Sequence, residues 1–198
     1  MTRIYGASAA AALAVFIVTG ASPASAACTA INTPAQLQDM LSNTAGNYCL
    51  KNDIDMKSIP NFLPVGLPAH MFTGTFDGGN HVISNLATNH SDLDHVGLFG
   101  ITNGATIKNV TIDNPKVVAG QVGDHVGALV GTAEGTTISN VHVVNGEVVL
   151  NAQGGDGGGI AGFLTANSTI DLSSVATDVV TKGDANAGGL AGEPDANI

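Results

Sequence analysis

Val96-Gly97-Leu98-Phe99-Gly100 is the first of four glycine-bounded segments that recur along the chain. The later segments are Gly127-Ala128-Leu129-Val130-Gly131, Gly158-Gly159-Ile160-Ala161-Gly162 and Gly188-Gly189-Leu190-Ala191-Gly192. Their closing glycines lie 31, 31 and 30 residues apart. A repeat of nearly constant length indicates an architecture in which each unit packs on the next one.

The residues between these segments also match. Thr106-Ile107-Lys108-Asn109-Val110 aligns with Thr137-Ile138-Ser139-Asn140-Val141, and His81-Val82-Ile83-Ser84-Asn85-Leu86 is a looser copy. Apolar and polar residues alternate with period two, which predicts short strands, the glycine-bounded segment closing each unit as one of them. In this alignment Asn85, Asn109 and Asn140 share one position, so we expect a ladder of stacked side-chain amides.

Three strands and three turns in about 30 residues predict an all-β fold, a β-solenoid with one coil per repeat. Equivalent apolar residues then stack in one interior column, and the flanking glycines allow sharp turns and close approach of neighbouring coils. The residues expected to build this repeated corner are Gly97, Leu98, Gly100, Gly127, Leu129, Gly131, Gly159, Ile160, Gly162, Gly189, Leu190 and Gly192.

The glycine-bounded segments resemble the GLUG-motif repeat, named for its G-L-x-G signature. The resemblance covers about residues 96–192, and Ala128 and Gly159 depart from the signature in the second and third units. The preceding Phe72-Thr73-Gly74-Thr75-Phe76-Asp77-Gly78-Gly79-Asn80 is also similar to what precedes such repeats. The resemblance implies a right-handed parallel β-helix in a bacterial secreted or surface protein, often adhesin-like. Such repeats also occur as accessory regions of large secreted peptidases, and the motif carries no catalytic residues.

Four regions are expected along the chain. Residues 1–26 have the charged start, apolar stretch and A-x-A site of a cleaved signal peptide, so we expect a secreted or cell-surface protein. Residues 27–71 form the N-terminal cap and first strands, residues 72–192 the solenoid, and residues 193–198 a tail at a possible truncation. The last coil then continues into a longer array or meets a partner.

The cap is predicted to contain a short helix and a disulfide. Thr33-Pro34 is a helix start signal, and Ala35 to Leu41 would place Leu37, Met40 and Leu41 inward. Cys28 and Cys49 are the only two cysteines. Export favours their pairing, and without a C-x-x-C motif or nearby histidine a metal or redox role is the weaker interpretation.

The charge of the chain argues against several functions. The formal net charge is −10, and the only arginine, Arg3, lies in the expected signal peptide. The remaining five lysines and 16 acids give −11, which disfavours nucleic acid binding, phosphoryl transfer and attachment to anionic membranes. No membrane insertion after signal cleavage, no cofactor and no resident metal are expected. The expected partner is an unidentified surface ligand, either a glycan or a protein.

Two pairs of aspartates and an Asp-His repeat are candidate sites. Asp53/Asp55 and Asp92/Asp94 are pairs of carboxylates two residues apart, and solvated turn acids are the simpler interpretation. Asp94-His95 and Asp124-His125 occupy equivalent positions, with Asp156 and Asp184 in the next units. If these acids line up, weak Ca²⁺ binding is conceivable, but a polar column of turn residues is the favoured interpretation.

The sequence therefore favours a non-catalytic secreted or surface-displayed β-helix that acts as an adhesin-like binding or spacer module. One alternative is a carbohydrate-active enzyme with Asp92, Asp94 and His95 on a lateral face. Another alternative is an accessory segment of a larger secreted peptidase. The sequence does not separate the first hypothesis from the last.

Overall fold

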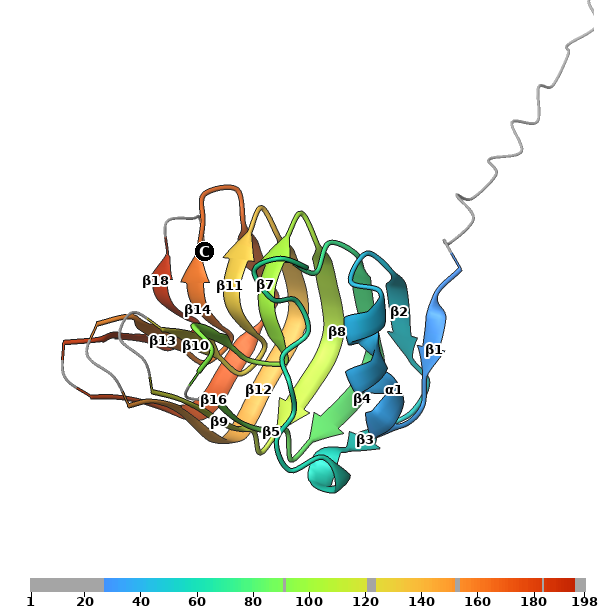
Figure 1. Ribbon diagram of the computed structural model, residues 1–198, viewed down its shortest axis with the longest axis horizontal. Helices are drawn as coiled ribbons and strands as arrows, with labels where there is room; N and C mark the ends of the chain where they lie inside the picture. The colour runs from blue at the N-terminus through green and yellow to red at the C-terminus, as the bar shows by residue number, and fades with distance from the viewer. Residues whose placement is uncertain (1–26, 91, 121–123, 152–153, 183, 195–198) are drawn as a thin grey trace, which may run out of the picture.

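The computed structural model describes residues 27–90, 92–120, 124–151, 154–182 and 184–194. It is an all-β, parallel solenoid of about five turns with one short α-helix, which confirms the predicted fold class (Figure 1). The expected signal peptide and residues 195–198 of the expected tail lie outside the described residues. Within the described part, no helix is long and apolar enough to cross a membrane.

The largest sheet holds the long strands of every turn, and all its pairings are parallel. Its ten strands are β1 (Thr29–Ile31), β2 (Asn47–Leu50), β3 (Ile54–Asp55), β4 (Thr75–Ser84), β5 (Ala87–His90), β8 (Thr106–Asp113), β9 (Lys116–Ala119), β12 (Thr137–Leu150), β15 (Thr169–Asp171) and β16 (Ser174–Thr181).

Two further parallel sheets form the rest of the wall, each with one short strand from four successive turns. One holds β6 (His95–Val96), β10 (His125–Gly127), β13 (Asp156–Gly158) and β17 (Asn186–Gly188). The other holds β7 (Phe99–Asn103), β11 (Val130–Glu134), β14 (Ala161–Leu164) and β18 (Ala191–Pro194). A complete turn therefore uses four strands in place of the predicted three, except where β12 runs through two strand positions.

The glycine-bounded segment is a corner, and the prediction that it forms a single strand is wrong. Between β6 and β7 the chain turns at Gly97 and Leu98. Val96 pairs with Val126, and Phe99 pairs with Val130, so the second corner has one residue more than the first. This extra residue shifts the alignment read from the sequence, which placed Val96 opposite Gly127.

The corner glycines stack because a side chain has no room between successive turns. A Cβ on Gly97 would lie 2.6 Å from the carbonyl oxygen of Gly127, and a Cβ on Gly158 would lie 2.8 Å from the Cα of Ala191, both in the next turn. The other repeat glycines that meet backbone atoms of a neighbouring turn within 2.8 Å are Gly100, Gly127, Gly131, Gly159, Gly162 and Gly192. In the last described turn, Gly189 has open space instead.

The interior of the solenoid is mainly apolar. Leu98, Leu129 and Ile160 are fully buried at the corner, whereas Leu190 in the last described turn is half-buried. Backbone bonds join the last three of these residues, from Leu129 N to Ile160 O at 3.1 Å and from Ile160 N to Leu190 O at 3.0 Å. Burial of such side chains stabilises the fold by about 1.5–3 kcal/mol each.

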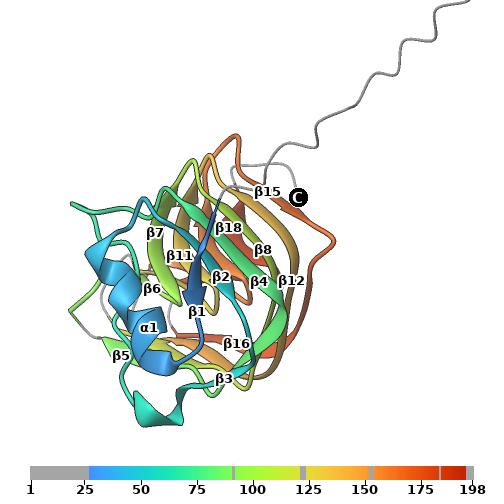
Figure 2. The same cartoon turned by 90° about the vertical axis from the view of Figure 1, so that its right-hand side faces the viewer.

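The N-terminal cap contains the predicted helix. Helix α1 (Pro34–Gln38) starts after Thr33, whose hydroxyl accepts a hydrogen bond from the Gln36 amide, and the 3₁₀ turns η1 (Asp39–Ser42) and η2 (Met56–Ser58) follow later. Leu37 and Met40 are fully buried, and Leu41 is half-buried. Figure 2 shows α1 and β1 in front of the stacked strands, so they cover the N-terminal end of the solenoid.

The structure pairs Cys28 with Cys49, with the two Cα atoms 5.8 Å apart. The disulfide joins the start of β1 to β2, its parallel neighbour. It closes a loop of 21 residues at the N-terminal end of the solenoid, which the cap covers.

We expect the double replacement Cys28→Ala and Cys49→Ala to lower the free energy of unfolding by about 3 kcal/mol, because the loop is no longer constrained in the unfolded chain. Urea unfolding followed by circular dichroism measures this loss. Reduction of the native chain should give the same value. Two curves that differ by less than about 0.5 kcal/mol would contradict the expectation, since that is the spread of neutral surface changes.

Candidate functional site

The residues proposed for an enzyme, Asp92, Asp94 and His95, line one pocket of about 110 Å³. The side chain of Asp92 is 82% exposed and lies 3.7 Å from His90, whereas His95 contacts a threonine of the next turn. Sugar hydrolysis needs two carboxyl groups that face the same bond. The pocket contains two carboxyl groups, while the contacts of Asp92 and His95 lead to different partners, His90 and Thr132.

The Asp-His repeat forms a column with a register that the sequence did not predict. His95 pairs with His125, His125 with Asp156, and Asp156 with Asn186 across four successive turns. Asp156 therefore lies in the histidine column. The alignment implied that Asp156 is equivalent to Asp124, and this is wrong. Asp184 is exposed and precedes this column.

A threonine from the neighbouring sheet connects the two histidines. Thr132 Oγ1 lies 2.8 Å from Nδ1 of His125 and 3.0 Å from Nδ1 of His95. The other ring nitrogen of His125, Nε2, lies 3.2 Å from Asp156 Oδ2. The imidazoles are close together, with ring centroids 5.3 Å apart, and Phe163 stacks on His125 at 5.0 Å. We call His95, Thr132, His125 and Asp156 the histidine network.

The network continues toward the last described turn. Asn186 Nδ2 donates to Asp156 Oδ1 at 2.8 Å and to Glu193 Oε2 at 3.1 Å. Thr132 and Asp156 are buried, with 5% exposure each, while both imidazoles are partly exposed. The network is therefore continuous through four turns and lies at the surface of the wall.

Burial lowers the pKa of both histidines below the usual range, because the charged imidazolium loses its hydration. For His95 the neighbouring His125 lowers the pKa further, while Asp94 opposes this shift. For His125 the opposing carboxylates are Asp156, Glu193 and Asp94. Both rings are thus held in the neutral form near pH 7.

The structure describes no group of three or more His, Cys, Asp or Glu side chains with the geometry of a metal site within residues 27–194 and outside the gaps. The stacked Asp and His residues hydrogen-bond along the network. The Ca²⁺ site that the sequence suggested as a possibility thus gains no support from this arrangement.

The predicted asparagine ladder exists between Asn109 and Asn140, but Asn85 is not part of it. Asn140 Nδ2 donates to Asn109 Oδ1 at 3.0 Å and to Asn80 Oδ1 at 3.2 Å. Strand β4 carries Gly78, Gly79 and Asn80 opposite the single residue Asn109, which shifts the register by two residues. The segment that pairs with Thr106-Ile107 is Thr75-Phe76, whereas Ile83 pairs with Ile112. The alignment of the looser copy is therefore wrong, and Asn80 occupies this column instead of Asn85.

Asn85 belongs to a second ladder one corner further along. Its Nδ2 donates to Asp55 Oδ1 at 2.8 Å, and its Oδ1 accepts from Asn114 Nδ2 at 2.9 Å. The asparagines of both ladders have left-handed backbone, with φ from +52° to +63°. Asparagine tolerates this conformation better than other residues with a side chain. These positions turn the chain and bond one turn to the next.

Each ladder ends on a carboxylate toward the N-terminus. Hydrogen bonds from Asn85 and from the Lys57 amide lower the pKa of Asp55. For Asp77, burial raises the pKa, but hydrogen bonds from the Gly79 amide and Asn109 outweigh it, so the pKa is lowered. Both acids are therefore ionised anchors of the ladders.

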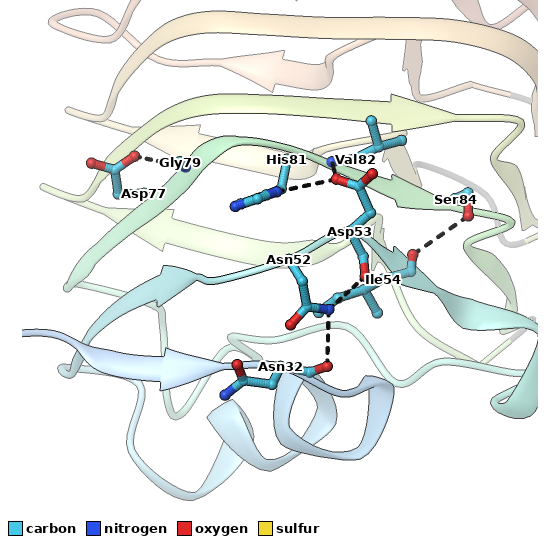
Figure 3. Close-up of polar contacts among 9 residues, drawn as sticks. All are labelled: Asn32, Asn52, Asp53, Ile54, Asp77, Gly79, His81, Val82 and Ser84. Atoms are coloured by element: carbon cyan, nitrogen blue, oxygen red, sulfur yellow. Dashed lines mark hydrogen bonds and ion pairs between the residues drawn. The ribbon is translucent and has the colours of Figure 1, made fainter.

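A third acid joins the strands near the cap. Asp53 Oδ1 accepts from the Val82 amide at 2.9 Å and lies 3.2 Å from His81 Nδ1 (Figure 3). The backbone bond from Val82 is the main cause that lowers the pKa of Asp53. Asn52 Nδ2 donates to the Asn32 carbonyl, so this corner is bonded to the cap as well (Figure 3). The acids of this region bind neighbouring turns.

Sequence reasoning missed Thr132 and Phe163. Both lie in the sheet of β7, β11, β14 and β18, one residue after the closing glycine of their corner. The repeat spacing does not indicate that these positions contact the histidines. The contact of these two positions with the histidine column could have been predicted only from the correct number of residues in each corner.

Comparisons with known proteins place this architecture. The profile of the M26 IgA1-specific metallo-endopeptidase N-terminal region matches residues 31–146. Halomucin of Haloquadratum walsbyi is 43% identical over 68 residues, which is 31% of this chain and 1% of Halomucin. The chain therefore spans about a hundredth of the length of that relative.

One solved structure has a similar fold. The crystal structure of a candidate immunoglobulin A1 protease from Bacteroides ovatus matches with a TM-score of 0.56. The alignment covers 85% of this chain and 74% of the other, at 17% sequence identity. At this identity the likeness concerns the fold alone.

Proposed function

Because the chain belongs to the family of M26 IgA1-specific metallo-endopeptidase N-terminal regions, we propose that it is a non-catalytic accessory module of a larger secreted peptidase. The match to residues 31–146, more than half of the chain, is the observation that carries this proposal. In this proposal residues 1–26 direct export, and the GLUG-type corners build a rigid spacer.

The polar chemistry of the solenoid supports a structural role. Asp53, Asp55 and Asp77 accept hydrogen bonds from neighbouring turns, and Asp156 accepts one from the turn that follows it. Carboxylates in this role hold turns together. A catalytic domain outside these residues would then perform the cleavage of peptide bonds.

The last described turn supports continuation of the solenoid or contact with a partner. Val179 of β16 is half-buried, whereas Val148, its partner in β12, is fully buried. The whole inward row of β16 is half-buried in the same way. A further turn packed in parallel on β16 would bury these side chains, as each earlier turn does for the one before.

A second candidate function is an adhesin-like spacer or binding module at a cell surface. The 43% identity with a segment of Halomucin favours it, because a similar segment also occurs in a protein whose name does not describe a peptidase. Its ligand would be a glycan or a protein.

Intact mass and peptide mapping of the protein as its native cell secretes it test the proposal. We expect a product that starts near Ala27 and extends well past Ile198 into a peptidase domain. That product should cleave IgA1, and the purified chain of 198 residues should not. A secreted product that ends at Ile198 would overturn the accessory role and leave the surface spacer.

Hydrolysis of protein or polysaccharide by the purified chain itself would overturn the non-catalytic assignment. In that case the triple variant Asp92→Asn, Asp94→Asn and His95→Gln tests the lateral pocket. Unchanged activity of this variant would exclude the pocket as the active site.

A further inference from the structure

We propose that the histidine network is an acid-sensitive latch between successive turns, closed while both imidazoles are neutral and opened when both are protonated. His95 lies in one turn, Thr132 and His125 in the next, and Asp156 in the third. They belong to β6 (labelled in Figure 2) and to β11, β10 and β13 (labelled in Figure 1). The protonation state of these four side chains therefore determines how strongly the three turns are hydrogen-bonded to one another.

At neutral pH the hydrogen bonds permit one arrangement of protons. An ionised Asp156 accepts only, so His125 donates through Nε2–H. The neutral ring then accepts at Nδ1, and the Thr132 hydroxyl donates to it. The threonine oxygen in turn accepts from Nδ1–H of His95. The network thus assigns His95 to the Nδ1–H tautomer and His125 to the Nε2–H tautomer.

One added proton is compatible with the same geometry. A proton on Nε2 of His95 leaves its Nδ1–H bond to Thr132 intact. A proton on Nδ1 of His125 requires Thr132 to reverse its hydroxyl and His95 to change tautomer, but every bond still has a donor and an acceptor.

A second proton breaks the arrangement. Both Nδ1–H groups then point at Thr132 Oγ1, and the hydroxyl proton loses its acceptor in a site that is 5% exposed. Two imidazolium rings also lie with centroids 5.3 Å apart. Like charges at this separation repel, and a buried donor without an acceptor destabilises the closed arrangement.

The surrounding charges set the direction of the pH dependence. The charged groups that face the two rings are Asp94 before β6, Asp156 of β13 and Glu193 of β18. These carboxylates raise the histidine pKa values, but burial lowers them more. Asp124, next to His125 in the chain, is fully buried. Because the folded pKa values lie below the unfolded value of about 6.5, stability is lost as the pH falls from 6.5 toward the folded values.

Asp53 and the two aspartates that anchor the ladders respond in a different pH window. The pKa values of Asp53, Asp55 and Asp77 are lowered, so their contribution is present above pH 3.8 and is lost only below it. Acidification from pH 7 to pH 5 therefore tests the latch without titrating these anchors.

Nitrogen-15 NMR of the imidazoles tests the proton arrangement at pH 8. In the native chain we expect His95 to be protonated on Nδ1 and His125 on Nε2. Thr132→Ser keeps the hydroxyl and should keep both tautomers. Thr132→Val removes the hydroxyl with little change in volume and should remove the Nδ1–H preference of His95. Protonation of His95 on Nε2 in the native chain, or unchanged tautomers in Thr132→Val, would refute the proposal.

Hydrogen exchange of the native chain tests the opening and needs no variant. Between pH 7 and pH 5, after correction for intrinsic exchange, we expect protection of the β10 and β11 amides to fall about tenfold for each pKa unit by which burial lowers the histidines. Amides of β2 and β4 should change less. Equal loss in all four strands, or no loss, would show that the network is not a local latch.

Discussion

Gly127→Ala is expected to destabilise the solenoid by about 4 kcal/mol or more, which is exceptional for the addition of one methyl group. The new Cβ would lie 2.4 Å from the carbonyl oxygen of Ile160, 2.5 Å from that of Val130 and 2.8 Å from the Cα of Ala161. All three atoms belong to the backbone, so no side chain can move aside. Relief requires the two turns to separate and lose the bonds between them.

Gly189→Ala is the control, because Gly189 lies at the same corner of the last described turn, one residue after Gly188, the position equivalent to Gly127. A Cβ there meets no atom within 4 Å, so the change should cost less than about 0.5 kcal/mol. Urea unfolding of both purified variants measures the difference. Equal stabilities would refute the close-approach explanation. In a longer native product with a further turn over this corner, Gly189→Ala should become costly as well.

Phe99→Ala is expected to cost about 3–5 kcal/mol, the range for deleting a buried aromatic side chain. Phe99 is fully buried, and its ring centroid lies 4.8 Å from that of Phe72 and 5.5 Å from that of Phe76. Its removal leaves a cavity in the first turns, where the rings of Phe72, Phe76 and Phe99 pack together.

Leu172→Ala provides the control for Phe99→Ala, since Leu172 is 75% exposed and should tolerate the change within about 0.5 kcal/mol. Thermal and urea unfolding report both variants. A loss below about 1 kcal/mol for Phe99→Ala would show that the core closes over the missing ring, contrary to the close packing of the interior.

Local patterns were sufficient to predict the cap and the parallel stacking. Thr33-Pro34 is a helix start because the threonine hydroxyl bonds to Gln36 and proline fixes the first turn, and neither depends on distant residues. The 31-residue spacing predicted the stack because units of equal length bury their apolar faces only against one another. The position of Gly127 follows from the same spacing.

Contacts between turns could not be predicted in the same way. The sequence alignment places Asn85 opposite Asn109, yet Thr75-Phe76 is the segment that pairs with Thr106-Ile107, and Asn85 lies against Asp55 and Asn114. One additional residue in the later corners likewise shifted the expected partners of Val96. A strand reverses the face of every side chain when its register moves by one residue.

The sequence by itself determined that this chain is a β-solenoid with about 30 residues per turn, a helical cap and glycine at each corner, because these properties depend on periodicity and local conformation. Only the tertiary structure decided that Thr132 lies between His95 and His125, and that Asp156 follows in the same column. Thr132 lies seven residues from His125 but 37 residues from His95, and contacts between turns depend on the number of residues in each corner.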